Sequence, residues 1–199
     1  PNLPLAKLVD DFESSYDYLA TRALDGKDVF MTNANAPLYR LVVGDARAAI
    51  VAAAAKGNAK GSSKKAPPPI GDWPDLVAQH PRHTLQFAKA MKGDEALVLG
   101  YLEDVATVLR HGSLVDGLGA AGGEGGGAAA GTVPLPPLGS VGDLSGDRED
   151  SVLFFTYTSF VDPGTTYSYD TAGVASEREE ARRRRTSSSP PSTAAAAAA

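Results

Sequence analysis

The stretch DEALVLGYLEDVATVLRH (residues 94–111) carries the densest apolar repeat in the chain. Apolar side chains recur there at intervals of three and four residues, at Leu97, Val98, Tyr101, Leu102, Val105, Val108 and Leu109. That spacing is typical of an amphipathic α-helix, and Gly112 directly after the stretch is a common helix terminator. We therefore expect a central helix over residues 94–111, with Leu102 and Val105 buried.

Apolar residues at helical spacing also occur on both sides of the central stretch. Segments 4–23, 37–56, 72–77 and 81–92 each begin near a proline or a capping aspartate, and three of them are followed by glycine. The second half of segment 37–56 is almost entirely alanine, which buries little area. Together with residues 94–111, these segments predict a small bundle of about five helices.

Two stretches of low complexity interrupt this pattern. Residues 57–71 combine Gly, Ser and Lys with the run Pro67, Pro68, Pro69, and predict a basic linker. Residues 116–149 are rich in Gly, Ala and Pro, a composition that cannot bury enough apolar surface to offset its ordering entropy. We expect this second stretch to be a spacer.

Residues 150–170 have a different character, rich in Val, Phe, Tyr and Thr. The turn residues Asp162, Pro163 and Gly164 separate two short runs of this composition, which predicts a β-hairpin. Both faces of the hairpin are apolar, and an isolated hairpin is marginally stable in water. We therefore expect it to dock on the helices or to join a sheet in another subunit.

The predicted fold class is accordingly α+β. It comprises a helical domain over residues 1–115 with the basic linker 57–71, a spacer over 116–149, a hairpin over 150–170 and an extended tail over 171–199. The tail consists of mixed charges, Ser-Pro residues and alanines.

No constellation of catalytic, metal-binding or cofactor-binding residues can be assembled from the sequence. The chain has no Cys and 3 His, so a structural zinc site at His80 and His83 would need His111 or an aspartate to complete it. The serines lie in flexible or Gly-rich contexts, and no G-x-S-x-G motif is present. The glycine run at 122–127 lacks the Lys-Ser/Thr of a phosphate loop. We expect no enzyme activity, no metal and no cofactor.

Two basic segments stand out in a chain of formal net charge -5, the linker lysines and the run Arg182, Arg183, Arg184 and Arg185. Such segments suit an anionic partner, either nucleic acid or an acidic protein surface. Interleaved aromatic residues for base stacking are missing, and the glutamates at 177–180 would repel phosphate. Protein is therefore the favoured partner and nucleic acid the second one.

The remaining candidates for partner binding are aromatic. Trp73 is the single tryptophan and follows a proline-rich approach, so it is either an anchor in a partner pocket or a plug in the core. The hairpin adds four aromatic residues that need a cover: Phe154, Phe155, Tyr157 and Phe160.

These observations predict a soluble, non-enzymatic structural subunit of a large assembly that binds other protein subunits through extended arms. A viral capsid or capsid-associated protein is the leading instance, located in a virion or in an intracellular assembly. The alternative is an accessory RNA- or DNA-binding protein that uses the basic linker and the arginine run. No apolar run is long enough to cross a membrane.

Overall fold

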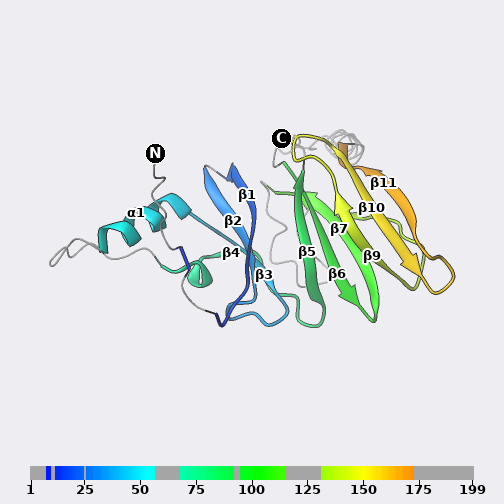
Figure 1. Cartoon of the computed structure of the whole chain (residues 1–199), viewed down its shortest axis with the longest axis horizontal. Helices are drawn as coiled ribbons and strands as arrows, with labels where there is room; N and C mark the ends of the chain where they lie inside the picture. Colours follow the sequence, from blue (N-terminus) through cyan, green and yellow to red (C-terminus); the bar gives the residue numbers. More distant parts are fainter. Residues whose placement is uncertain are drawn as a thin grey trace, which may run out of the picture.

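In the computed structural model the chain folds into three antiparallel β-sheets that stand side by side (Figure 1). The structure describes residues 8–9, 12–24, 26–56, 68–91, 95–114 and 131–172. In each sheet the strands pair in the order in which the chain forms them, so every sheet is a meander.

The first sheet has 4 strands in the order β1-β2-β3-β4. They are β1 (Tyr16–Leu24), β2 (Lys27–Thr32), β3 (Arg40–Gly44) and β4 (Asp75–Val77). Between β3 and β4 the chain leaves the sheet to form α1 (Ala46–Lys56) and the short 3-10 helix η1 (Ile70–Asp72).

The second sheet also has 4 strands, and the third sheet has 3. The second consists of β5 (Thr84–Met91), β6 (Ala96–Glu103), β7 (Ala106–Ser113) and β8 (Gly131–Thr132). The third consists of β9 (Gly139–Ser145), β10 (Val152–Ser159) and β11 (Thr165–Asp170).

Two hydrophobic cores hold the sheets together face to face. The core between the first and second sheets contains Val29, Leu41, Val77, Leu97, Leu99 and Tyr101. The core between the second and third contains Val98, Leu109, Val141, Leu153, Phe155 and Tyr157. The second sheet is therefore buried on both faces, and its neighbouring residues Leu97 and Val98 face opposite cores.

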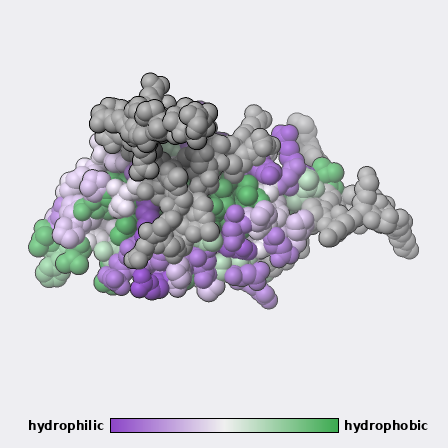
Figure 2. Space-filling model, turned by 180° about the vertical axis from the view of Figure 1, so that it is seen from behind, coloured by the Kyte–Doolittle hydropathy of each residue, from purple (hydrophilic) through white to green (hydrophobic). Residues whose placement is uncertain are grey.

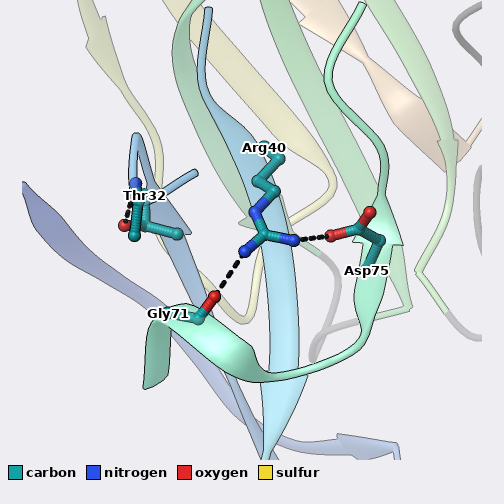
Figure 3. A network of polar contacts seen from close by, with 5 residues as sticks. Thr32, Arg40, Gly71 and Asp75 are labelled. Carbon is teal, nitrogen blue, oxygen red and sulfur yellow. Dashed lines mark hydrogen bonds and ion pairs between the residues drawn. The ribbon is translucent and has the colours of Figure 1, made fainter. Parts of the chain in front are cut away.

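A third cluster covers the outer face of the first sheet. Phe30 and Val42 pack there against Ile70 of η1 and against Trp73, which is 4% exposed. Arg40 holds η1 in place, because its guanidinium donates hydrogen bonds to the Gly71 carbonyl at 2.5 Å and to the Asp75 carboxylate at 2.6 Å (Figure 3). The outer face of the first sheet is thus closed by its own long β3–β4 connection.

The predicted helical bundle is wrong, because the described chain is mostly β-strand. Of the stretch 94–111, the described residues 95–111 form most of the hairpin of β6 and β7 rather than a central helix. Leu102 and Val105, which we expected to be buried, are 37% and 87% exposed. A strand buried on both faces has no alternation of polar and apolar residues, so its apolar residues fall by chance at helical spacing.

The other segments that we expected to be helical also contribute mainly strands. Segment 4–23 contributes β1, segment 81–92 contributes β5, and segment 37–56 is divided between β3 and α1. Only the alanine-rich half of that last segment is helical. The basic linker lies mostly outside the described residues.

The hairpin expected within residues 150–170 is confirmed, since β10 and β11 pair in antiparallel fashion from Val152↔Asp170 to Tyr157↔Thr165. It joins a sheet of its own chain, because β10 also pairs with β9. Strands β8 and β9 lie within the stretch expected to be a spacer. No helix in the described part of the chain is long and apolar enough to cross a membrane.

Candidate functional site

Five connections between strands lie at the same end of the three sheets. In an antiparallel meander alternate connections share an end, so residues 33–39, 78–83, 104–105, 133–138 and 160–164 gather at the lower end of the strands in Figure 1. The residues that lead into β1, 12–15, lie at the same end because Tyr16 pairs with Thr32. We call these six segments the loop surface.

Strained backbone is concentrated in the loop surface. Six non-glycine residues of the described chain have positive φ, and five of them lie here: Asn35, Tyr39, Asp104, Val105 and Leu138. Asparagine and aspartate tolerate this conformation, but a bulky or β-branched side chain is strained in it. Tyr39 (φ 64°), Val105 (φ 65°) and Leu138 (φ 59°) therefore each hold strain, in three different connections.

Exposed apolar side chains gather at the same end. The five large hydrophobic residues with an exposed fraction of 80% or more are Phe12, Val105, Leu138, Phe160 and Val161, and all five belong to the loop surface. Figure 2 shows hydrophobic surface at the lower left, where the third sheet ends. The described part of the chain thus presents its most exposed apolar residues on one side.

Hydrogen bonds tie neighbouring connections to one another. The backbone N–H of Leu38 donates to Gln79 Oε1 at 3.1 Å, and the Leu38 carbonyl accepts from the N–H of Leu85 at 3.0 Å. At the third sheet, the Tyr157 hydroxyl donates to the Pro136 carbonyl at 2.8 Å or the Pro137 carbonyl at 3.0 Å. These bonds anchor residues 33–39 of the loop surface to β5 and residues 133–138 to β10.

A cluster of titratable side chains lies where the first and second sheets meet at this end. The rings of His80 and His83 are 4.3 Å apart, and the His80 ring is 5.8 Å from that of Tyr101. Arg110 lies over the Tyr101 ring at 5.2 Å and forms an ion pair with Glu103 at 2.6 Å. Burial lowers the pKa of His80, with further lowering by His83 and Arg110, and burial raises the pKa of Tyr101.

The hydrogen bonds of His80 decide what this cluster can do. Its Nδ1 accepts the backbone N–H groups of Arg82 at 3.2 Å and His83 at 2.9 Å, so the proton of the neutral ring is on Nε2. The base of a Ser-His-Asp triad has the opposite arrangement, with a proton on Nδ1 and a free Nε2. His80 therefore shapes the connection rather than acting as a catalytic base. The described residues include no group of three possible metal ligands.

The residues expected to bind a partner are placed in different environments. Trp73 lies in the cluster on the outer face of the first sheet, and Phe155 and Tyr157 lie in the core between the second and third sheets. Phe154 is 46% exposed on the far face of β10, and Phe160 is fully exposed in the loop surface. Arg182, Arg183, Arg184 and Arg185 lie outside the described residues.

Sequence reasoning missed the loop surface because it placed Val105 inside a helix. A signal for the true structure was present, since Gly100 and the β-branched Val98, Val105 and Val108 all disfavour a helix interior. Asp104 and Val105 separate two runs rich in strand-forming residues, and these runs became the paired strands β6 and β7.

The arrangement of consecutive antiparallel sheets packed face to face agrees with the comparison to known proteins. The family model described as "Prolyl oligopeptidase, N-terminal beta-propeller domain" matches residues 1–182. The chain belongs to this family. A blade of a β-propeller is a four-stranded sheet, so the first and second sheets each have the strand number of one blade, and the third sheet has three strands.

Solved structures of prolyl oligopeptidases share the fold. One, from a structural and mechanistic study of two prolyl endopeptidases, is 21% identical with a TM-score of 0.57, over 84% of this chain and 19% of its own. Prolyl oligopeptidase B from Galerina marginata, bound to a 35mer hydrolysis and macrocyclization substrate, is 19% identical with a TM-score of 0.58, over 83% of this chain and 18% of its own. The chain thus spans about a fifth of the length of these prolyl oligopeptidases.

Membership of the prolyl oligopeptidase propeller family corrects three expectations. The predicted structural subunit of a viral capsid is wrong, because the family is a domain of peptidases. The expectation of no enzyme activity is contradicted for the same reason, although the match is to the propeller domain and not to a catalytic domain. The same family match contradicts the alternative function, an accessory nucleic-acid-binding protein.

Proposed function

We propose that this chain is part of the non-catalytic propeller domain of a peptidase that cleaves peptides at proline. The observation that carries this proposal is the family match over residues 1–182, supported by the three consecutive blade-like sheets. In this role the propeller binds the domain that performs the chemistry and takes part in selecting the peptides that reach it.

The side chains of the described residues fit a supporting role. The hydrogen bonds at His80 Nδ1 hold that ring in the tautomer that does not serve as a base toward a serine hydroxyl. The buried polar groups instead join strands and connections, as Thr107 and Tyr157 do. Hydrolysis of the peptide bond is therefore assigned to a separate catalytic domain.

The test uses the native protein, captured from the source cells with an antibody raised against the 199-residue chain. The captured material is assayed with two chromogenic peptides that differ only in Pro or Ala before the reporter group. We expect the proline peptide to be cleaved several times faster than the alanine peptide. Captured protein, identified by mass spectrometry, that cleaves neither peptide contradicts the proposal.

A second assay tests whether this chain has peptidase activity when it is produced without a catalytic domain. The 199-residue chain produced alone is expected to leave both peptides intact, because it contributes the propeller and not the catalytic groups. Cleavage by the chain alone, lost when His80 is replaced, would assign the chemistry to this chain and overturn the supporting role.

A further inference from the structure

We propose that the turn of residues 80–83 is an acid-sensitive latch that holds the β2–β3 connection of the first sheet against the second sheet. In the closed latch the turn is fastened by the neutral ring of His80, and the latch opens when that ring takes up a proton. The inference goes beyond the proposed function and does not depend on it, because the latch contains no reacting group.

The turn links the two sheets through the chain and through hydrogen bonds on both of its sides. It lies between β4 of the first sheet and β5 of the second, at the lower end of the strands in Figure 1. Before the turn, Gln79 Oε1 accepts the N–H of Leu38 at 3.1 Å, and after it the N–H of Leu85 donates to the Leu38 carbonyl at 3.0 Å. Both backbone groups of Leu38 are thus held by residues that flank the turn.

The closure of the turn depends on one atom of His80. Its Nδ1 accepts the backbone N–H groups of Arg82 at 3.2 Å and His83 at 2.9 Å, and the residue is 7% exposed. A proton on Nδ1 converts this acceptor into a donor that faces two other donors. The protonated ring is therefore incompatible with the closed turn, and protonation breaks both hydrogen bonds together.

The side chains nearest to His80 oppose a positive charge on its ring. His83 and Arg82 belong to the same turn, and the His83 ring lies 4.3 Å from the His80 ring. Arg110 adds a permanent positive charge from β7 of the second sheet. Burial of the ring lowers the pKa of His80, and these three neighbouring side chains lower it further. The proton therefore binds more readily to the open turn than to the closed one.

Two groups of β6 face the same cluster. Among the described neighbours, Glu103 is the one whose charge favours a protonated His80, but its carboxylate forms an ion pair with Arg110 at 2.6 Å. The Tyr101 ring is 5.8 Å from the His80 ring, and burial raises the pKa of its hydroxyl, so this group stays neutral near pH 7. The described part of the chain thus offers the protonated ring no unpaired carboxylate in the closed turn.

The latch is expected to open as the pH falls through 6.5, the ordinary pKa that His80 regains in the open turn. Below that pH the open population grows by up to about 10-fold for each pH unit, until the pKa of the closed form is reached. Val29, Leu41 and Leu97 of the core between the two sheets do not titrate, so the opening stays local to the turn and to Leu38.

Hydrogen exchange of the native protein, expressed from its natural coding sequence, measures the opening. Exchange is followed by mass spectrometry at about pH 7.5 and about pH 5.5, and each peptide is compared with the same peptide from the unfolded chain at the same pH. We expect peptides that contain residues 38 and 82–85 to lose about 10-fold in protection at the lower pH. Peptides from β10, which contains no histidine, should change by less than about 2-fold.

Three variants assign the effect to the latch. His80→Asn keeps an oxygen that can accept the N–H groups of Arg82 and His83 but does not titrate, so its protection should be equal at both pH values. His83→Gln keeps the ring of His80 and removes one charge beside it, so the loss of protection should be smaller than in the wild type. His111→Asn is the matched control, because it removes the remaining histidine, which lies against Tyr169 of β11. It should leave the loss unchanged.

Any of four results would overturn this inference. They are no loss of protection in the wild type at the lower pH, the same loss in His80→Asn, the same loss in His83→Gln, or an equal loss in β10. The last result would mean that the whole chain unfolds rather than the turn. The measurement does not use peptidase activity, so the latch and the proposed function can fail separately.

Discussion

The hydroxyl of Thr107 on β7 accepts the backbone N–H of Val141 on β9 at 3.2 Å, and it donates to Gln86 Oε1 on β5 at 3.3 Å. One side chain that is 5% exposed therefore joins the second sheet to the third. A buried, directional bond of this kind helps to fix how the two sheets align.

Thr107→Val is expected to lower the free energy of unfolding by about 1–3 kcal/mol. The substitution keeps the shape of the side chain and leaves the Val141 N–H without a partner in a buried position. Urea unfolding followed by circular dichroism measures the change. Thr158→Val is the control, because Thr158 is exposed on the far face of β10, and its effect should stay within about 0.5 kcal/mol. Equal effects of the two substitutions would contradict the role of Thr107.

Val105→Asn is expected to raise the free energy of unfolding of the isolated chain by about 1 kcal/mol. Val105 has φ 65°, and asparagine adopts this conformation at less cost than a β-branched residue does. The matched control is Val161→Asn, which changes an equally exposed valine that has no positive φ. If the two substitutions change the free energy of unfolding by the same amount, the backbone at Val105 is not strained.

Gly100→Ala is expected to destabilise the second sheet by about 1–3 kcal/mol through overpacking. Gly100 pairs with Phe87 across β5 and β6, and a Cβ at Gly100 would lie 2.2 Å from Phe87 Cζ. Gly142→Ala is the control, since nothing lies within 4 Å of its added Cβ. Thermal unfolding of both variants gives the comparison, and a neutral Gly100→Ala would mean that the Phe87 ring moves freely.

The pH dependence of stability should carry a contribution from His80. Burial lowers the pKa of His80 below its usual 6.5 in the folded chain, with His83 and Arg110 adding to the effect. Around and below pH 6.5 the unfolded chain therefore binds the proton more readily than the folded chain, and the free energy of unfolding falls as the pH decreases through 6.5.

His80→Asn tests this contribution, because the Asn side-chain oxygen can accept the N–H groups of Arg82 and His83 without titrating. We expect the variant to show a smaller loss of stability over the same pH range, measured by urea unfolding at several pH values. An unchanged slope would assign the pH dependence to other groups.

The hairpin of β10 and β11 could be predicted from the sequence because its information is local. Asp162, Pro163 and Gly164 specify a turn, and the β-branched and aromatic residues on either side favour strands. The alanine-rich helix over Ala46–Lys56 could be predicted for the same reason, since alanine has the highest helix propensity of any residue.

Residues 94–111 show what only the tertiary structure decided. Leu97, Leu99 and Tyr101 face the first sheet and Val98 faces the third, so β6 is apolar on both sides and lacks the alternation that identifies a strand. The helical interpretation of the same residues failed because burial on both faces is a property of three sheets packed together.

The loop surface likewise depends on tertiary structure. Phe12, Val105, Leu138 and Phe160 are far apart in the sequence, and no local pattern connects them. They lie at the same end of the three sheets because, in consecutive antiparallel strands, every second connection lies at that end. The sequence by itself therefore determined the one hairpin and the one helix whose signals are local. The order of the sheets, the two-sided burial of β6 and the common exposure of these four side chains required the packing of the whole chain, because long-range contacts between sheets set them.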